Sequence, residues 1–298
     1  MGTSKVATQN YILYKGMYEL KPIFSLPITE TSTLFDMGSN LQSFNGATPD
    51  AAVFYKERGW VLIDTLNQEQ TQQLQNWVDD VASWPLGGGE WIHHREMTEA
   101  GPQLARTENF TPFHDGLRAL LRHGAMLEVA SALLEEEAVL YKEKVNYKLV
   151  GGAGFAPHQD APAYRFIDNH ISCMVAVDDS TPENGCLDVV SSRYDEILPM
   201  DERGCITADV VESMTWIPAP IKAGQTLWFH SRTPHRSGPN TSAKNRRALY
   251  PTYNALREGD LRDAYYAQKH QEWQEARDRG EKPGLSLIGD FQGVLIDE

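Results

Sequence analysis

Two hydrophobic periods divide the chain. In residues 67–134, apolar side chains recur every three or four positions, which predicts amphipathic helices. The first helix, with Asn67 as its N-cap, carries an apolar stripe made of Leu74, Trp77, Val78 and Val81. Two more helices are expected within 113–134, and residues 53–66 (VFYKERGWVLIDTL) predict a short helix that passes into a strand. Such stripes are typical of helices that pack on a sheet.

From residue 138 the period changes to two, which is the period of β-strands. Turn sequences such as GGAG, DDSTPENG and RSGPNTS separate the runs. The strand-like runs are 138–150, 170–179, 185–190, 215–221, 225–230 and 246–254. Many short strands after a group of helices predict a mainly β fold, a jelly-roll barrel with helices on one outer face. A polar helix with Tyr265, Tyr266 and Trp273 is expected near the end of the chain.

Composition limits the function more than the fold. Of the 298 residues 41% are hydrophobic, enough for a sizeable core, and we expect one domain at 50–298 after an irregular arm at 1–49. A net charge of -14 argues against nucleic acid or an anionic membrane as a partner. Three cysteines without CxxC spacing predict neither a disulfide framework nor a cysteine zinc site. Without an apolar leader or a run of 18 apolar residues, the sequence predicts a soluble cytoplasmic protein.

A histidine and an aspartate stand one residue apart in the stretch GFAPHQDAP. In an extended segment, residues i and i+2 point to the same side, so His158 and Asp160 can supply two neighbouring ligands to one metal ion. The pair alone is weak support, because such pairs usually form a surface hydrogen bond. Downstream, His230 and His235 precede Arg246, whose planar guanidinium suits a ligand that carries a carboxylate.

The run 139–149 alternates between an apolar and a polar face. The polar face carries Lys142, Lys144, Asn146 and Lys148. These side chains must meet water, either on the outer surface of the sheet or inside a polar cavity, and the strand alone does not decide between the two.

Taken together, these segments resemble the phytanoyl-CoA dioxygenase family, a branch of the Fe(II)/2-oxoglutarate oxygenases. The resemblance covers about residues 52–255 and is carried, in order, by FYKERGWVLIDTL, YKLVGGAGFAPHQD, VAVDDSTPENGCLDVV and HRSGPNTSAKNRR. It implies that the barrel is a double-stranded β-helix of the cupin type. It also implies Fe(II), 2-oxoglutarate as cosubstrate, and O₂.

Matched residue by residue, the resemblance implies a metal triad of His158, Asp160 and His235. Arg246 matches the arginine that binds the C5 carboxylate of 2-oxoglutarate, and its position eleven residues beyond His235 favours that histidine over His230. Further cosubstrate contacts are implied at Ser237, Lys144, Asn146 and Met174. Two of these, the lysine and the asparagine, favour the cavity interpretation of the polar face.

Three other polar residues are candidates for substrate contact, each with a plainer alternative. Arg106 either contacts substrate or pairs with Glu108, which is the usual arrangement for charges near a core. Gln159 either lines the pocket or points outward between the two ligands, and Tyr164 flanks the triad on its far side.

The remaining histidines and two departures from the family pattern complete the candidates. The pair at 93–94 beside Glu96 looks more like a loop pair than a metal cluster, and His170 looks structural or pocket-lining. Residues 191–194 read SSRY where the family usually has a Pro-Gly-Ser-His turn, and Arg236 stands where glycine is common. Both departures bear on the substrate entrance, so the substrate cannot be inherited from the family name.

The resemblance implies an enzyme that oxidises an unactivated C–H bond, most simply by hydroxylation, while 2-oxoglutarate and O₂ become succinate and CO₂. Lys144, Lys148 and Arg106 favour a small polar or anionic metabolite over a lipid as its partner. The run KVNYKLVGGAGFAPHQD resembles members that hydroxylate aminophosphonates such as 2-aminoethylphosphonate. The alternatives are a tailoring oxygenase that desaturates or closes rings, a zinc hydrolase with the same triad, and a non-catalytic jelly-roll binding protein. The hydrolase would have no use for Arg246.

Overall fold

The computed structural model describes residues 41–86, 91–164, 166–280 and 291–296. In this part of the chain, the strands form one 11-stranded and one 4-stranded sheet. Along the large sheet the order is β1 (Ser43–Phe44), β2 (Trp60–Asp64), β11 (Gln225–His230), β8 (His170–Ala176), β13 (Arg246–Leu249), β6 (Lys144–Lys148), β4 (Gly101–Glu108), β3 (Ile92–Thr98) and β15 (Val294–Ile296). Off this path, β8 is joined through β14 (Thr252–Ala255) to β5 (Ala138–Lys142). The small sheet has the order β10 (Ile217–Ala219), β9 (Leu187–Val189), β12 (His235–Ser237) and β7 (Phe155–His158).

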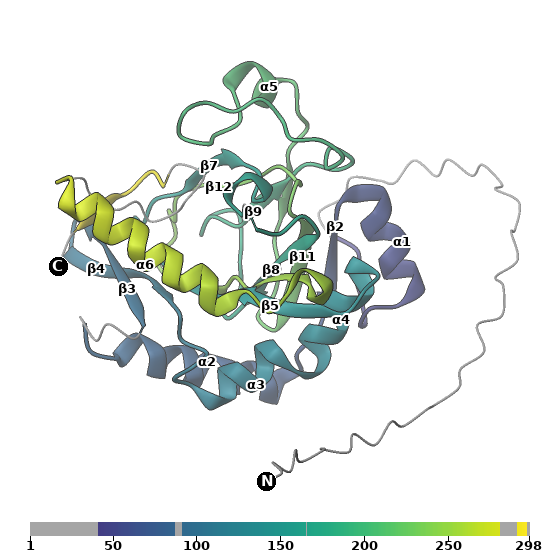
Figure 1. Ribbon diagram of the computed structural model, residues 1–298, viewed down its shortest axis with the longest axis horizontal. Helices are drawn as coiled ribbons and strands as arrows, with labels where there is room; N and C mark the ends of the chain where they lie inside the picture. Colours follow the sequence, from purple (N-terminus) through teal and green to yellow (C-terminus); the bar gives the residue numbers. More distant parts are fainter. Residues whose placement is uncertain (1–40, 87–90, 165, 281–290, 297–298) are drawn as a thin grey trace, which may run out of the picture. The chain divides into compact units, whose positions relative to one another are not determined.

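Helices cover one face of the large sheet, and the small sheet covers the other (Figure 1). The helices are α1 (Pro49–Arg58), α2 (Gln68–Ser83), α3 (Asp115–Arg122), α4 (Gly124–Leu134), α5 (Ala208–Glu212) and α6 (Arg262–Asp278), with 3₁₀ turns η1 (Ala161–Ala163) and η2 (Leu256–Glu258). Residues of α1 to α4 pack into one apolar cluster with the large sheet. None of the helices in the described residues has both the length and the apolar composition needed to cross a lipid bilayer.

The alternation of side chains on β8 explains why both faces of this strand are buried. Ile171, Cys173 and Val175 join the cluster beneath the helices. Met174 and Ala176 point the other way and pack with residues of the small sheet. The predicted jelly-roll with helices on one outer face is thereby confirmed.

Helix α2 begins at the predicted N-cap. The Asn67 side chain accepts a hydrogen bond from the Gln70 amide at 2.9 Å, and the Gln70 side chain accepts one from the Asn67 amide at 2.9 Å. Leu74, Val78 and Val81 of the predicted stripe are fully buried. Each such side chain contributes roughly 1.5–3 kcal/mol relative to an exposed one, so the stripe holds the helix on the sheet.

The predicted strand 139–149 is two strands, β5 and β6, separated by Glu143. The Glu143 side chain is fully buried and faces α6, where the Arg262 guanidinium binds it. An apolar residue at this position would have continued the alternation, whereas a buried carboxylate requires a cation beside it.

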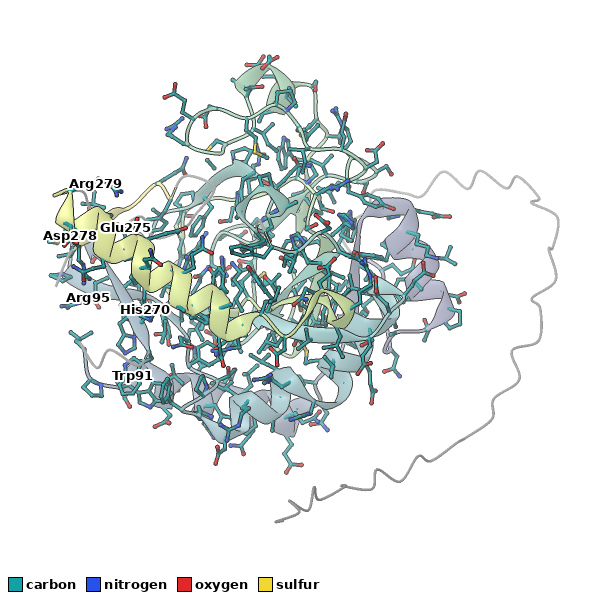
Figure 2. The ribbon with its side chains drawn as sticks, in the orientation of Figure 1. Trp91, Arg95, His270, Glu275, Asp278 and Arg279 are labelled. Atoms are coloured by element: carbon teal, nitrogen blue, oxygen red, sulfur yellow. The ribbon has the colours of Figure 1, made fainter. Side chains whose placement is uncertain are left out.

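The end of the predicted N-terminal arm differs from the expectation. Residues 43–44, expected in an irregular arm, form β1 and pair in parallel with β2. Residues 1–40 lie outside the described part, so the rest of the predicted arm stays a prediction. The predicted polar helix is α6, and the charged residues Glu275, Asp278 and Arg279 gather near its end, away from the end that begins at Arg262 (Figure 2).

Candidate active site

Three predicted metal ligands meet where β7 ends and β12 begins. His158 is the last residue of β7 and His235 the first of β12, and the two stand opposite each other in the ladder. Their rings are 4.2 Å apart between centroids. Asp160 follows on the turn before η1, and its Oδ1 lies 4.0 Å from Nε2 of His158 and 3.9 Å from Nε2 of His235. Two histidines and one carboxylate therefore face a common point.

Asp160 reaches this point by a turn and not by an extended strand. Its backbone is helical, with φ -72° and ψ -32°, because η1 begins directly after it. The carboxylate still converges with His158, but the geometry predicted for an i, i+2 pair on one strand is not the cause. The Ser172 hydroxyl of β8 donates to Asp160 Oδ2 at 2.5 Å and leaves Oδ1 directed at the imidazoles.

Backbone carbonyls orient both imidazoles. Nδ1 of His158 lies 2.7 Å from the Ala156 carbonyl, and Nδ1 of His235 lies 3.0 Å from the Thr233 carbonyl. A carbonyl can only accept, so each Nδ1 carries the hydrogen and each Nε2 keeps its lone pair for a metal.

The charges of the three groups suit a divalent cation. Burial lowers the pKa of His158 to about 3 and also lowers that of His235, so both rings are neutral near pH 7. Burial by itself raises the pKa of Asp160, but attraction to His235 and Lys142 outweighs it, and the net effect lowers the pKa of this carboxyl. Two neutral nitrogens and one carboxylate form a donor set that fits non-haem Fe(II) and leaves further coordination positions open.

A cavity adjoins the triad and is lined from both sheets. Polar side chains of β5 and β6 form one wall: Lys142, Lys144, Asn146 and Lys148. The polar face of the run 139–149 therefore borders a cavity.

At one end of the cavity, Arg246 is 1% exposed and incompletely paired. Its Nη2 donates to the Gly185 carbonyl at 2.6 Å, while Nε and Nη1 are buried without a hydrogen-bond partner among the described residues. Lys148 stands opposite Arg246 in the ladder and donates to the Ser237 hydroxyl at 2.9 Å. Unsatisfied guanidinium hydrogens are costly in a buried site and match the oxygens of a carboxylate.

At the other end, two lysines lie near the charges of Asp160 and Glu108 but make no direct bond with either. The ammonium of Lys142 lies 4.4 Å from the Tyr164 ring centroid, and that of Lys144 lies 5.5 Å from the Tyr250 centroid. Neither ammonium has a hydrogen bond or an ion pair with any residue that the structure describes. Burial lowers the pKa of Lys142 to about 8 and that of Lys144 well below its usual value. An anion bound between them would restore both charges.

The predicted cosubstrate residues fall into two groups. Lys144, Asn146, Ser237 and Arg246 line the cavity. Met174 shares the inward face of β8 with Ser172 but packs among Leu187 and Phe229, and it is fully buried in that apolar cluster. Met174 is not among the residues that line the cavity, although its neighbours Leu187 and Phe229 are, and a cosubstrate contact at Met174 stays a prediction.

The predicted substrate residues Gln159 and Tyr164 also lie behind the cavity wall. The Gln159 amide donates to the carbonyls of Glu196 and Arg232 and accepts from the Leu198 amide. These bonds occupy the side chain, which is fully buried and is not among the residues that line the cavity. Tyr164 contacts a residue of the cavity wall, because its ring centroid lies 4.4 Å from the Lys142 ammonium.

Arg106 pairs with Glu108, as in its plainer alternative, and it is not among the residues that line the cavity, so a substrate contact stays a prediction. Its Nε donates to Asn146 Oδ1 at 2.8 Å, and its Nη1 lies 3.5 Å from Glu108 Oε1. Arg106 thus pairs with Glu108 and also holds a side chain of the cavity wall.

Of the residues that line the cavity, Lys142 was named only as part of the polar face, and Ser172 was not named at all. The alternation had placed Lys142 on the polar face, so a signal existed. Ser172 gave none, because its hydroxyl meets Asp160 only through the packing of β8 against the loop after β7.

The remaining histidines stay outside the triad. His230 accepts from the Arg232 amide at 3.0 Å, and His170 is buried against the Tyr164 ring. His93 bonds the Thr107 hydroxyl, and His94 faces Glu108. Within the described ranges, His158, Asp160 and His235 are the group whose ligand atoms lie within 4.8 Å of one another.

Of the two departures from the family pattern, Arg236 lines the cavity, whereas residues 191–194 are outside its lining. Ser191 accepts a hydrogen bond from the Trp60 indole at 2.9 Å. Arg236 pairs with Asp188 at 2.9 Å and lies 4.4 Å from the Trp216 ring centroid. Both residues therefore serve packing between loops and strands, and neither contacts the triad in these bonds.

Known proteins match the chain over most of this region. The family described as phytanoyl-CoA dioxygenase matches residues 55–248. A methylphosphonate hydroxylase of Gimesia maris is 46% identical over 242 residues, which cover 80% of this chain and 93% of that protein. A 2-aminoethylphosphonate dioxygenase of an uncultured bacterium (HF130_AEPn_1) is 36% identical over 76% of this chain and 88% of its own length.

Among solved structures, the crystal structure of EctD from S. alaskensis with 2-oxoglutarate and 5-hydroxyectoine has a TM-score of 0.63. It is 18% identical and covers 74% of this chain and 81% of its own. The epimerase SnoN from nogalamycin biosynthesis has a TM-score of 0.59 at 21% identity, with coverage of 70% and 82%. These likenesses support the jelly-roll fold.

Proposed function

The chain belongs to the phytanoyl-CoA dioxygenase family, and from this premise we propose that it hydroxylates a C–H bond of a small alkylphosphonate. The enzyme class expected from the sequence is confirmed: the protein is an iron- and 2-oxoglutarate-dependent dioxygenase, an oxidoreductase that acts with O₂ on a small molecule. The zinc hydrolase and the non-catalytic binding protein are not favoured. A cytoplasmic location stays a prediction.

The triad and Arg246 divide the cosubstrate functions between them. His158, Asp160 and His235 would hold Fe(II), which with 2-oxoglutarate and O₂ supplies the oxidation of a C–H bond and gives succinate and CO₂. Arg246 would receive the far carboxylate of 2-oxoglutarate on its unpaired Nε and Nη1. The hydrogen bond between Lys148 and Ser237 fixes the neighbouring groups, so this end of the cavity is ordered before the cosubstrate arrives.

The observation that carries the substrate proposal is the pair of ammonium groups at Lys142 and Lys144, neither of which has a hydrogen bond or an ion pair among the described residues. Both lie on the cavity wall near Asp160, and a phosphonate dianion supplies the two negative charges that they lack. An anionic head held there leaves the carbon next to phosphorus close to the triad, where the reaction takes place.

A phosphonate without an amino group fits this wall better than an aminophosphonate. In the described lining of the cavity, Asp160 is the one carboxylate, and it would be engaged by the metal. A substrate ammonium would have no free acid to pair with and would meet two lysines of like charge. We therefore place methylphosphonate ahead of 2-aminoethylphosphonate as a substrate.

The test supplies the iron-loaded enzyme with 2-oxoglutarate, O₂ and one of three compounds: methylphosphonate, ethylphosphonate or 2-aminoethylphosphonate. We expect methylphosphonate to stimulate succinate release at least tenfold over the enzyme without substrate, with a hydroxylated product in the phosphorus NMR spectrum. Stimulation by a neutral or cationic metabolite, with none by any phosphonate, would contradict the proposal.

A further inference from the structure

Helix α6 lies beyond the residues 55–248 that match the family, yet two of its cations reach the wall that holds the cavity lysines. The Arg262 guanidinium binds both oxygens of Glu143, at 2.9 and 2.6 Å. Lys269, two helical turns further, places its Nζ 2.5 Å from Glu108 Oε2. The seven-residue separation puts both cations on one face of the helix, which lies across this part of the sheet (Figure 1).

Both ion pairs are almost completely buried. Lys269 is 3% exposed and Glu108 2%. Burying a pair of charges rarely stabilises a protein more than apolar residues of similar size would, so such a pair calls for another explanation. Here each pair occupies a carboxylate next to the two lysines: Glu143 lies between them in the chain, and Glu108 stands opposite Lys144 in the sheet.

Glu108 is the carboxylate best placed to neutralise Lys144. The two residues are directly opposite in the antiparallel ladder between β4 and β6, so their side chains share one face with Cβ atoms about 5 Å apart. Opposite charges in this relation normally attract each other. Nevertheless, no ion pair joins Glu108 to Lys144 in the described structure.

Other groups occupy the Glu108 carboxylate instead. Oε2 is taken by Lys269 at 2.5 Å. Oε1 lies 3.5 Å from Arg106 Nη1 and 3.4 Å from His94 Nε2. Arg106 is shared with Asn146, and burial lowers the pKa of His94 to about 4, so this ring is neutral near pH 7. Of these groups, Lys269 is thus the cation that bonds Glu108 without also bonding a side chain of the cavity wall.

We propose that Lys269 is a positioning residue for the substrate: by holding Glu108, it keeps that carboxylate away from Lys144 and leaves the Lys144 ammonium for the anionic group. The inference rests on the proposed function insofar as this anion is a phosphonate. Without Lys269, Glu108 turns toward the cation opposite it and competes with the substrate for Lys144.

The test compares three variants with the wild-type enzyme: Lys269→Met, the double variant Glu108→Gln with Lys269→Met, and Lys56→Met. The last removes an exposed ion pair with Glu135 and serves as a matched control. Two quantities are measured for each: the KM values for methylphosphonate and 2-oxoglutarate, and the rate at which cyanate carbamylates Lys144, read by mass spectrometry.

In Lys269→Met, we expect the KM for methylphosphonate to rise at least tenfold, with the KM for 2-oxoglutarate within twofold of wild type. Carbamylation of Lys144 slows at least fivefold, because pairing with Glu108 favours the unreactive ammonium. In the double variant the competing charge is gone, so both quantities return to within threefold of wild type. Lys56→Met changes neither.

The proposal fails if Lys269→Met leaves both quantities unchanged, or if the folded double variant stays as impaired as the single one, since Lys269 would then be merely structural. Should Lys269→Met not fold, the double variant decides alone: a KM within threefold of wild type supports the proposal, and a tenfold loss overturns it. If the wild type turns over no phosphonate while the labelling pattern holds, the proposed substrate is wrong and the role of Lys269 stands.

Discussion

The two ends of the cavity treat positive charge differently. At the Arg246 end, protein groups already hold the cations: Nη2 bonds the Gly185 carbonyl, and Lys148 bonds Ser237. At the other end, the ammonium groups of Lys142 and Lys144 meet aromatic rings and no acceptor among the described residues. The first end suits a planar carboxylate, such as the far carboxylate of 2-oxoglutarate. The second offers charge with little directional constraint, which suits the tetrahedral head of a phosphonate.

The difference shows how one cavity can keep two anions apart. A guanidinium binds planar carboxylates with two parallel bonds, whereas an ammonium acts as a point charge. The metal triad lines the same cavity as both kinds of cation, so under the proposed function each anion has a preferred end.

The largest effect is expected from removing a metal ligand, because the anions at both ends of the cavity depend on the metal. His235→Ala should abolish iron binding and lower turnover by at least about a thousandfold, because the two remaining ligands form an incomplete set. His230→Ala is the matched control, since His230 bonds the Arg232 amide and takes no part in the triad. Equilibrium binding of Fe(II) under anaerobic conditions measures both, and loss of iron in His230→Ala alone would reverse the assignment.

Removing the guanidinium should affect only one end. Arg246→Met is expected to raise the KM for 2-oxoglutarate about a hundredfold, because a charge-assisted bidentate pair is lost. Affinity for methylphosphonate, measured by calorimetry on the iron-loaded variant saturated with 2-oxoglutarate, should stay within threefold. Equal losses for both anions would show that the two ends are not separate.

The complementary change is Lys142→Met with Lys144→Met. We expect the KM for methylphosphonate to rise about thirtyfold, since two charge-assisted contacts in a largely buried site are removed. The KM for 2-oxoglutarate should remain close to wild type. Steady-state kinetics with each compound varied in turn checks this, and a rise in the KM for 2-oxoglutarate alone would place the lysines at the wrong end.

A smaller effect is expected at the carboxylate ligand. Ser172→Ala removes the hydrogen bond to Asp160 Oδ2 and frees the carboxylate to rotate. Loss of such a partner typically costs 10- to 100-fold in metal affinity, so we expect about a tenfold weaker binding of Fe(II). Ser172→Thr keeps the hydroxyl and serves as the control in the same titration.

The smallest effect concerns pH. Burial lowers the pKa of Lys142 to about 8, and a bound anion raises it again, so binding takes up a proton. Affinity for methylphosphonate should therefore fall as the pH rises above 8, by at most about tenfold per pH unit. Lys142→Arg keeps its charge over this range and should flatten the profile measured by calorimetry. An identical slope in the two proteins would remove Lys142 from the site.

The sequence predicted those parts of the site that follow from local pattern. The position of Lys142 and Lys144 on one face follows from the alternation of the strand, and the ligands stand at strand ends that composition and turns mark out. The convergence of His158 with His235 needed the family resemblance as well, because 77 positions along the chain separate the two residues, the difference between their numbers.

What the sequence missed depends on contacts between distant segments. Gln159 lies between two ligands, and only the loop carbonyls of Glu196 and Arg232 turn it away from the cavity. Met174 lies on β8 and on the face toward the small sheet, but it packs in the apolar cluster and is not among the residues that line the cavity. The partner of Glu108 is 161 residues away on a helix whose polar sequence looks like an ordinary solvated surface.

One measurement tests the division of the cavity most directly. Under anaerobic conditions, Fe(II) and 2-oxoglutarate are added to the wild type and to the Lys142→Met, Lys144→Met double variant, and the visible charge-transfer band is followed while methylphosphonate is titrated. We predict the band in both proteins and a change of the band on adding methylphosphonate in the wild type alone. An equal change in the variant, or no band in the wild type, would contradict the account.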